Sequence, residues 1–271
     1  MSTTQRIQYT LQLADNALIN GHRLSEWCGH GPILEQDIAL SNIALDHLGA
    51  ARSLYQYAAA QFNALTAGEK EGFFSSPLIQ QVSGDIDEDD LAYLRDGWDF
   101  RNALITELPN RDWAFTVARS FYLDTFNYFL YKELLQSKDE TIAAVAEKSL
   151  KEVTYHLRWS SEWVIRLGDG TDESRARMQE ALNEYWAYTG ELTTPSPADT
   201  AMLQEGTGAD LAVVKANWEQ RIAKVVAEAT LTLPAAAWMQ SGGKEGRHSE
   251  HLGYVLTELQ FMQRAYPNME W

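Results

Sequence analysis

Cysteine and long apolar segments are almost absent from this chain. Its 271 residues include a single cysteine, Cys28, which cannot form an internal disulfide, so the fold does not need an oxidising compartment. The first ten residues, MSTTQRIQYT, lack the apolar stretch of a signal peptide. No apolar run approaches the roughly 18 residues of a membrane span. These features predict a cytoplasmic protein without a membrane segment.

Basic residues are also scarce. The chain has 22 Lys and Arg against 38 Asp and Glu, which gives a net charge of −16 at pH 7. A surface of this charge repels phosphodiester backbones and anionic membranes, which argues against nucleic acid and lipid as partners. An anionic small molecule would need a local basic patch.

Apolar and aromatic residues are plentiful. They make up 45% of the chain and include 9 Trp, 12 Tyr and 9 Phe, enough for a sizeable core and too many for a disordered chain. Proline occurs only 7 times, which suits long helices. Because helical periodicity dominates and no sustained period of two competes with it, the sequence predicts an all-α fold.

Breaks at glycine and proline divide the chain into long helical segments. Helices are expected over about 8–28, 33–65, 88–108, 111–136, 141–167, 172–190, 209–231 and 247–265, with a loop at 66–90 and a linker at 193–208. We expect a single domain over 1–271. Its core bundle covers about 1–190, and a C-terminal helical extension over about 191–271 packs on the core, because roughly 60 trailing residues would be marginal alone.

One helical segment nearly carries a di-iron signature. Carboxylate-bridged metal bundles place Glu-x-x-His on each of two helices and a further Glu on each of the other two. Here His156 is present, but the residue three positions before it is Val153, which cannot bind iron. The sequence therefore predicts a bundle that binds no metal and has no catalytic residues of its own. The positions of its degenerate site are Glu26, Asp46, Asp124, Val153 and His156.

The segment 33–65 has a face of small and polar residues. Ala39, Asn42, Asp46, Gly49 and Ser53 recur three or four positions apart, which places them on one side of a helix. One interpretation is an inward polar face with Asp46 as a remnant metal ligand. The other is close helix–helix packing, with Asp46 in a buried hydrogen bond.

Asp124 has aromatic neighbours along its helix, including Phe121 and Tyr128. Such an apolar setting predicts partial burial and a raised pKa unless the carboxylate is paired. Arg52 or Arg158 could pair with acids of this kind inside the bundle, so that salt bridges replace iron.

A literal Glu-x-x-His does occur, at Glu245 and His248, in the glycine-rich segment 242–246. A metal site there would need a second such pair, which the sequence lacks. A second hypothesis is anion capture by glycine N–H groups, Lys244 and Arg247 at a helix N-terminus. The third is an ordinary capped helix start.

The residues match a known family over nearly the whole chain. The matching stretches are RLSEWCGH at 23–30, DIALSNIALD at 37–46, YHLR at 155–158, RLGDGT at 166–171, GGK at 242–244 and HSEHLG at 248–253. On these stretches the chain resembles the structural, non-catalytic subunits of bacterial phenylacetyl-CoA 1,2-epoxidase. The main departure is an insertion near 66–84.

The resemblance implies a ferritin-like helical bundle. It also implies a partner: the di-iron catalytic subunit, a different chain, which inserts one oxygen atom of O₂ into the aromatic ring of phenylacetyl-CoA. A separate reductase with flavin and an Fe–S centre delivers electrons from NADPH. The structural subunit, with no cofactor of its own, pairs with the catalytic subunit and supports it, together with other subunits of the complex.

The resemblance further implies that the structural subunit borders phenylacetyl-CoA near the interface. The residues implied by position are Asp99, Phe100, Arg101, Asn102, Thr200, Ala201 and Met202. Arg101 could meet a CoA phosphate, and Phe100 could pack on the ligand. Alternatively, both are ordinary surface or core residues.

Three functions remain open from the sequence. The chain could be a scaffold subunit of an oxygenase, a di-iron oxidase with irregular ligands, or an acyl-CoA-binding module without an enzyme partner. The small number of metal ligands argues against the second function. The net charge of −16 without a clear basic cluster argues against the third.

Overall fold

The computed structural model describes residues 3–266 and residue 269, and this part of the chain forms helices and no strands. The all-α prediction is confirmed. No helix within the described ranges is long and apolar enough to cross a membrane.

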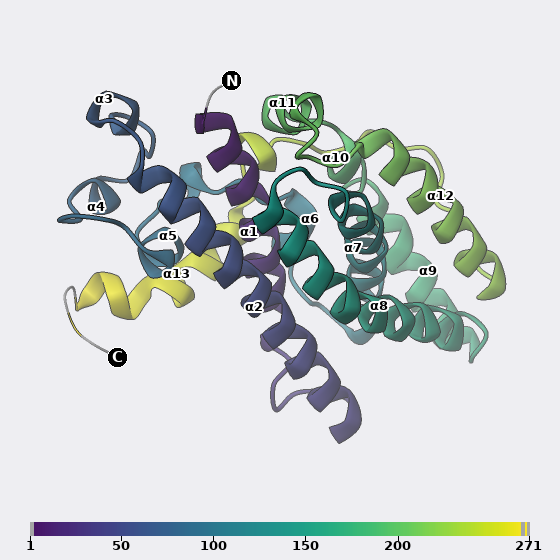
Figure 1. Cartoon of the computed structure of the whole chain (residues 1–271). Helices are drawn as coiled ribbons and strands as arrows, with labels where there is room; N and C mark the ends of the chain where they lie inside the picture. Colours follow the sequence, from purple (N-terminus) through teal and green to yellow (C-terminus); the bar gives the residue numbers. More distant parts are fainter. Residues whose placement is uncertain (1–2, 267–268, 270–271) are drawn as a thin grey trace.

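Four long helices form the central bundle: α1 (Thr3–Ser25), α2 (Leu34–Asn63), α7 (Trp113–Leu134) and α8 (Glu140–Gly168). The most extensive packing is within the pairs α1–α2 and α7–α8, and α2 also packs against α8 (Figure 1). Each pair is joined by a short connection, which brings successive helices together as antiparallel neighbours. The side chain of Asp139 begins α8 by accepting hydrogen bonds from Thr141 N and Ile142 N, both at 3.1 Å.

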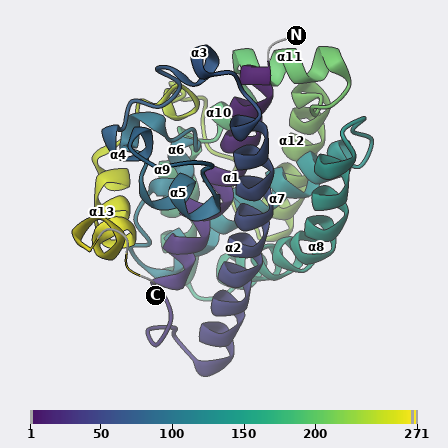
Figure 2. The same cartoon turned by 60° about the vertical axis from the view of Figure 1, so that its left-hand side comes forward.

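Further helices cover the bundle. They are α9 (Asp172–Trp186), α10 (Gly190–Thr193), α11 (Pro197–Glu205), α12 (Leu211–Glu228) and α13 (Glu250–Ala265). Helices α9 and α12 pack on α7 and α8, and α11 packs on α1. Helix α13 packs against α5 (Glu88–Tyr93), on a different side of the molecule from α12 (Figures 1 and 2).

Short helices occupy the segments between. They are α3 (Ala67–Lys70), α4 (Pro77–Gln80), η1 (Gly97–Asp99), α6 (Leu104–Glu107) and η2 (Gly243–Glu245). The predicted loop at 66–90 therefore contains helical turns, and the predicted linker at 193–208 contains α11.

The predicted continuous helix over 88–108 is wrong, because that segment is broken into α5, η1 and α6. Side chains of other helices bind its backbone N–H groups. Asp15 accepts from Arg101 N and Asn16 accepts from Ala103 N, both at 2.7 Å. Glu191 accepts from Leu104 N at 2.8 Å. These bonds replace the helical ladder that the sequence pattern predicts.

A buried ion pair holds the same segment on α1. Arg95 and Asp15 are both fully buried, with 2.5 Å between Arg95 Nη2 and Asp15 Oδ1. The hydroxyl of Tyr55 donates to the same Asp15 oxygen at 2.5 Å. The guanidinium of Arg95 also lies 4.2 Å from the centre of the Phe100 ring. Three helical segments therefore meet around one carboxylate.

Candidate metal centre in the bundle core

The inward face of α2 is not the face that the small and polar pattern indicates. Ile43, Ala44 and His47 are buried, whereas Asn42 is exposed. Asp46 lies at the edge, with 35% of its side chain exposed. Helix α2 is apolar on both of its sides, so the sequence pattern does not distinguish the core face from the outer face.

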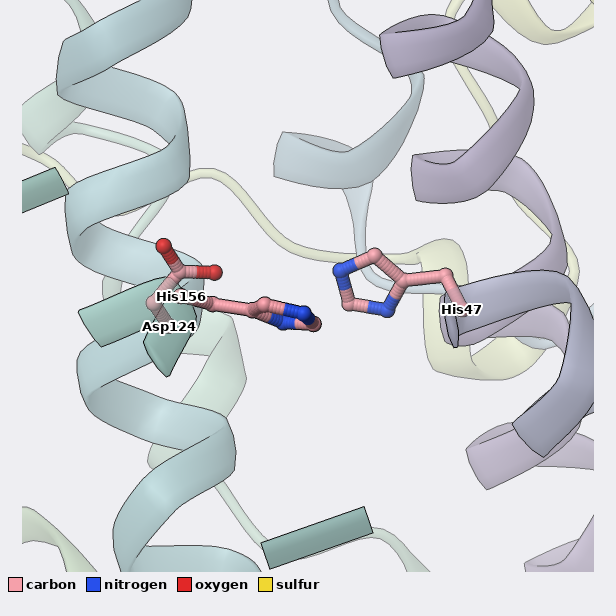
Figure 3. A group of neighbouring side chains, drawn as sticks. All are labelled: His47, Asp124 and His156. Atoms are coloured by element: carbon pink, nitrogen blue, oxygen red, sulfur yellow. The ribbon is translucent and has the colours of Figure 1, made fainter. Parts of the chain in front are cut away.

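Helices α2 and α8 carry matching pairs of residues in the core. The pairs are Ala44-x-x-His47 and Val153-x-x-His156, and all four residues are buried. The centres of the two imidazole rings are 5.2 Å apart. Figure 3 shows the His47 ring facing His156 and Asp124 across the core. Each pair is a Glu-x-x-His motif in which an apolar residue stands at the glutamate position.

Helix α1 approaches this point closely. At Gly21, an added Cβ would lie 3.2 Å from His47 Cβ and 3.3 Å from Ala44 O, tighter than most real contacts. The absence of a side chain at Gly21 therefore lets α1 pack against the turn of α2 that carries His47.

His156 has one paired and one unpaired ring nitrogen. Its Nε2 lies 2.9 Å from Asp46 Oδ2. Its Nδ1 is buried and has no partner among the residues described. In the neutral ring, Nε2–H donates to the carboxylate of Asp46, which leaves the lone pair of Nδ1 free in the core.

His47 is held by α1. Its Nε2 lies 3.0 Å from Asn20 Nδ2, and the Oδ1 atom of the same amide is buried without a partner in the described structure. Burial, together with the nearby His156, lowers the pKa of His47 to about 3. The ring is therefore neutral at pH 7 and able to bind a metal ion.

Asp124 is the acid of this group. It is buried on α7, and its Oδ2 has no hydrogen-bond partner in the described part of the chain. Burial raises its pKa to about 6, against the opposing effects of His156 and the Ser160 hydroxyl. The predicted burial and raised pKa are confirmed.

The predicted arginine partners of the core acids are wrong. Arg52 lies 3.1 Å from Glu88, and its side chain is 71% exposed. Arg158 lies 3.7 Å from Glu162 along the surface of α8. A histidine takes the place of an arginine, because His156 is the residue that pairs with Asp46. The sequence left Asp46 as either a remnant metal ligand or a hydrogen-bonding residue. The structure favours the hydrogen bond, which Asp46 forms with His156 at the edge of the core.

Three side chains from three helices converge in the core. One ligand atom from each of His47, Asp124 and His156 lies within 4.8 Å of the others (Figure 3). A di-iron centre of the bundle type needs four carboxylates and two histidines. In the described core the two motif positions for glutamate hold Ala44 and Val153, so these residues do not fit a di-iron centre.

Glu26 lies away from this cluster. Its Oε1 is 2.7 Å from Arg23 Nη1, and its Oε2 accepts from Asn110 Nδ2 at 2.9 Å. Arg119 in turn donates to the amide oxygen of Asn110. Glu26 therefore belongs to a separate polar network beyond the last turns of α1, and the structure does not place it with Asp46, Asp124, Val153 and His156.

Sequence reasoning misses His47 and Asn20. Asp46 is the residue of this turn of α2 that the small and polar pattern singles out, and its i+3 position is Gly49. The available signal is the parallel between Ala44-x-x-His47 and Val153-x-x-His156, which places a histidine at equivalent positions of two facing helices.

The glycine-rich segment near η2 encloses internal carboxylates. Gly242 N donates to Glu191 Oε1 at 2.7 Å, and Lys244 Nζ lies 3.1 Å from Asp199 Oδ2. Glu245 forms an ion pair with Arg247. The anion-capture hypothesis is therefore wrong, because protein carboxylates already occupy these donors.

His248, the other half of the literal Glu-x-x-His, also has protein partners. Its Nδ1 lies 2.9 Å from Glu107 Oε2 and its Nε2 lies 3.1 Å from Phe100 O. Ser249 then caps α13, accepting from His251 N at 3.3 Å. The structure favours the capped helix start.

Residues 99–102, for which the resemblance implies contact with the acyl-CoA, make mostly internal contacts. Asp99 accepts from Ser75 N at 2.6 Å, and the Phe100 ring packs under Arg95. Asn102 is fully buried. The Arg101 side chain donates to Gln8 Oε1 at 3.1 Å and to neighbouring backbone carbonyls. Their role toward a substrate stays a prediction.

The second implied group lies on α11. Thr200 is exposed and donates to Ser196 O at 3.1 Å, whereas Ala201 and Met202 are buried. A cavity of about 630 Å³ lies elsewhere, between η1 and α13, with Trp98, His248 and Leu256 among its lining residues. The contact of Thr200, Ala201 and Met202 with a substrate also stays a prediction.

Comparison with known proteins identifies the family. The chain is 41% identical over 267 residues to the C subunit of 1,2-phenylacetyl-CoA epoxidase from Escherichia coli (strain K12), covering 98% of this chain and 99% of that protein. The prediction of a ferritin-like helical fold is confirmed. Residues 1–271 match the family described as Phenylacetic acid catabolic protein. The chain therefore belongs, over its whole length, to the phenylacetic acid catabolic protein family.

Proposed function

We propose that this chain is the non-catalytic, structural subunit of a phenylacetyl-CoA 1,2-epoxidase. In this function it pairs with the di-iron catalytic subunit and supports it. The observation that carries the proposal is the replacement of both motif glutamates by Ala44 and Val153 in an otherwise recognisable metal bundle. The relative from Escherichia coli, which is named as a subunit of this epoxidase and aligns over nearly the full length, supports the same function.

The chemistry of the core supports a structural function for this chain and a catalytic function for its partner subunit. Two bridged iron ions carry several positive charges, and neutralising them requires carboxylates from the surrounding helices. Here Asp124 is the carboxylate of the cluster, and Asp46 stands outside it behind His156. A core of this composition is suited to supporting the bundle and unsuited to activating oxygen.

The outward face of α2 supports a protein partner. Leu34, Ile38 and Leu45 recur on one side of the helix and are 71%, 52% and 63% exposed. The opposite side of α2 packs in the core, so the helix has an apolar stripe on each of these two sides. An exposed apolar stripe is typical of a protein–protein contact, which supports the proposal that the catalytic subunit covers this face. The first turns of α2 also project beyond the body of the molecule (Figures 1 and 2).

In this proposal the cofactors belong to other chains. The di-iron centre lies in the catalytic subunit, and a reductase with flavin and an Fe–S centre supplies electrons from NADPH. Phenylacetyl-CoA is bound near the interface, and the complex works in the cytoplasm.

The test is reconstitution from purified subunits. We expect this chain to co-purify with the catalytic subunit and to raise epoxidation of phenylacetyl-CoA when the reductase and NADPH are present. We expect this chain alone to form no epoxide. Turnover by this chain without the catalytic subunit, with two iron ions bound per chain, would contradict the proposal.

A further inference from the structure

We propose that the core of this chain binds one divalent transition-metal ion, such as Zn²⁺, through His47, Asp124 and His156. The ion would have a structural function, tying α2, α7 and α8 together. The sequence predicts no metal in this chain, and the proposal departs from that prediction for one ion while leaving the absence of a di-iron centre intact.

The first argument is the convergence of donors. Their ligand atoms lie within 4.8 Å of one another on three different helices. A four-coordinate Zn²⁺ ion with bonds of about 2.0–2.2 Å holds neighbouring ligand atoms roughly 3.3 Å apart. The side chains therefore need to close by up to about 1.5 Å, which small rotations of one Asp and two His side chains can supply.

The second argument is the set of unpaired polar atoms. His156 Nδ1, Asp124 Oδ2 and Asn20 Oδ1 are all buried, and each is without a partner among the residues that the structure describes. Buried polar atoms are nearly always satisfied, so three of them around one point of a core indicate a missing ligand. A metal ion satisfies the imidazole nitrogen and the carboxylate together.

The third argument is the orientation of His156. Asp46 accepts from its Nε2 at 2.9 Å, which directs the lone pair of Nδ1 into the core. A carboxylate behind a histidine in this way is the usual outer partner of a metal-binding imidazole, because it fixes the tautomer and strengthens the ligand. Asp46 is thus a positioning residue, and its partly exposed location does not prevent that function.

Asn20 completes the arrangement from α1. Its amide now donates toward His47 Nε2 across 3.0 Å. Binding of an ion through Nε2 requires this amide to turn over, which brings the unpaired Oδ1 atom toward the ion as a fourth donor. Each of the four bundle helices then contributes one ligand.

The donor set selects the class of ion. Two imidazoles and carboxylate or amide oxygens, with no thiolate, suit Zn²⁺ and its spectroscopic substitute Co²⁺. A second ion is excluded because Ala44 and Val153 stand where bridging carboxylates would have to be.

The experiment is metal titration of the full chain after removal of metals with a chelator. We expect one Zn²⁺ per chain after dialysis, measured by elemental analysis, and a rise in Tm on Zn²⁺ addition. With Co²⁺ we expect visible absorption bands of a low-coordinate site. His156→Gln, His47→Gln and Asp124→Asn should each lower the affinity at least 10-fold, and Asp46→Asn about 10-fold.

The matched control is His30→Gln, because His30 is an exposed histidine, and its Nδ1 lies 3.1 Å from the carbonyl oxygen of Cys28, outside the cluster of His47, Asp124 and His156. This variant should bind Zn²⁺ like the unaltered chain. Metal-free unfolding curves establish that each variant folds, and Asp124→Asn retains the shape of the side chain it replaces. Zn²⁺ retention that is equal in the unaltered chain and in the His47→Gln and His156→Gln variants would overturn this proposal but not the proposed function. Two iron ions per chain, together with epoxidation by this chain in the absence of the catalytic subunit, would overturn both.

Discussion

At the scale of single residues, the core contains two ionisable groups whose burial has opposite consequences. Burial keeps His47 neutral by lowering its pKa from 6.5 to about 3. Burial also favours the neutral form of Asp124 by raising its pKa from 3.8 to about 6. Protonation of His47 therefore stabilises the unfolded chain relative to the folded chain. Protonation of Asp124 stabilises the folded chain relative to the unfolded chain.

The stability of the metal-free chain should show these two effects separately. Below pH 6.5 the unfolded chain protonates His47 while the folded chain does not, so this residue lowers stability as the pH falls toward 3. Between pH 6 and 3.8 the folded chain protonates Asp124 first, so this residue raises stability as the pH falls. We expect Asp124→Asn to lose stability more steeply than the unaltered chain from pH 6 to 4.

The second variant, His47→Gln, removes the group that lowers stability as the pH falls. It should therefore lose less stability than the unaltered chain between pH 6 and 4. Urea unfolding with a chelator at pH 6, 5 and 4 measures both slopes. Identical slopes for the two variants and the unaltered chain would contradict the assigned protonation states.

The buried pair of Asp15 and Arg95 gives a second prediction at this scale. Asp15→Asn leaves the fully buried guanidinium without its counter-charge, so we expect a loss of about 3–5 kcal/mol in the free energy of unfolding. The matched control is Glu184→Gln, which breaks a pair with Arg111 at the surface and should cost less than about 1 kcal/mol. Denaturant unfolding measures both losses. Equal losses in the two variants would show that the buried pair stabilises the fold no more than the surface pair does.

At the scale of elements, the long helices were predictable and the irregular segment 95–104 was not. The periodicity of α2, α7 and α8 and the breaks around them locate these helices closely, because each helix satisfies its own backbone. The segment from Arg95 to Leu104 depends on Asp15, Asn16 and Glu191, which are distant in sequence. Local patterns do not contain such partners, and the predicted helix over 88–108 failed for this reason.

The candidate site was predictable only in part. Val153 and His156 follow from a short motif, and the burial of Asp124 follows from its aromatic neighbours. His47 and Asn20 depend on the rotation of α2 and on the close approach of α1 at Gly21. Because α2 is apolar on both sides, the sequence does not determine which side faces the core.

Close packing between elements gives a third prediction. A Cβ at Gly243 would overlap Asn102 O and lie 3.0 Å from Leu104 N, so Gly243→Ala must push η2 away from the segment 102–104. We expect a loss of about 1–3 kcal/mol in the free energy of unfolding. Limited proteolysis should then cut sooner between α12 and α13.

Gly253→Ala is the control for this prediction. Gly253 lies within α13, and an added Cβ there has no atom of the described structure within 4 Å. This substitution should be neutral or stabilising by up to about 1 kcal/mol, because alanine favours helices. If Gly243→Ala were as stable as Gly253→Ala, the close packing of Gly243 against the backbone of Asn102 and Leu104 would be contradicted.

At the scale of the whole molecule, the outward side of α2 is the surface proposed to bind the catalytic subunit. Replacing Ile38 or Leu45 by glutamate places a charge on this exposed apolar face. We expect each variant to fold normally and to bind the catalytic subunit at least 10-fold more weakly, because a buried charge at an interface is not compensated. Pull-down and calorimetric titration measure the loss.

Val213→Glu is the matched control for the α2 variants, since Val213 is also exposed but lies on α12. It should leave binding of the catalytic subunit unchanged. Equal weakening by Val213→Glu and Leu45→Glu would mean that general charge, and not the α2 face, governs association.

The projecting first turns of α2 also constrain the shape of whatever receives them. This end is held on the α8 side, because Gln36 Oε1 accepts hydrogen bonds from Trp159 Nε1 at 2.8 Å and Trp163 Nε1 at 2.9 Å, whereas Leu34 is 71% exposed. A partner can therefore reach the end of α2 only from the sides that α8 and the segment 26–33 leave open. A concave surface there would fix the angle between the two proteins as well as their contact, since a projecting end seated in a hollow has little freedom to tilt.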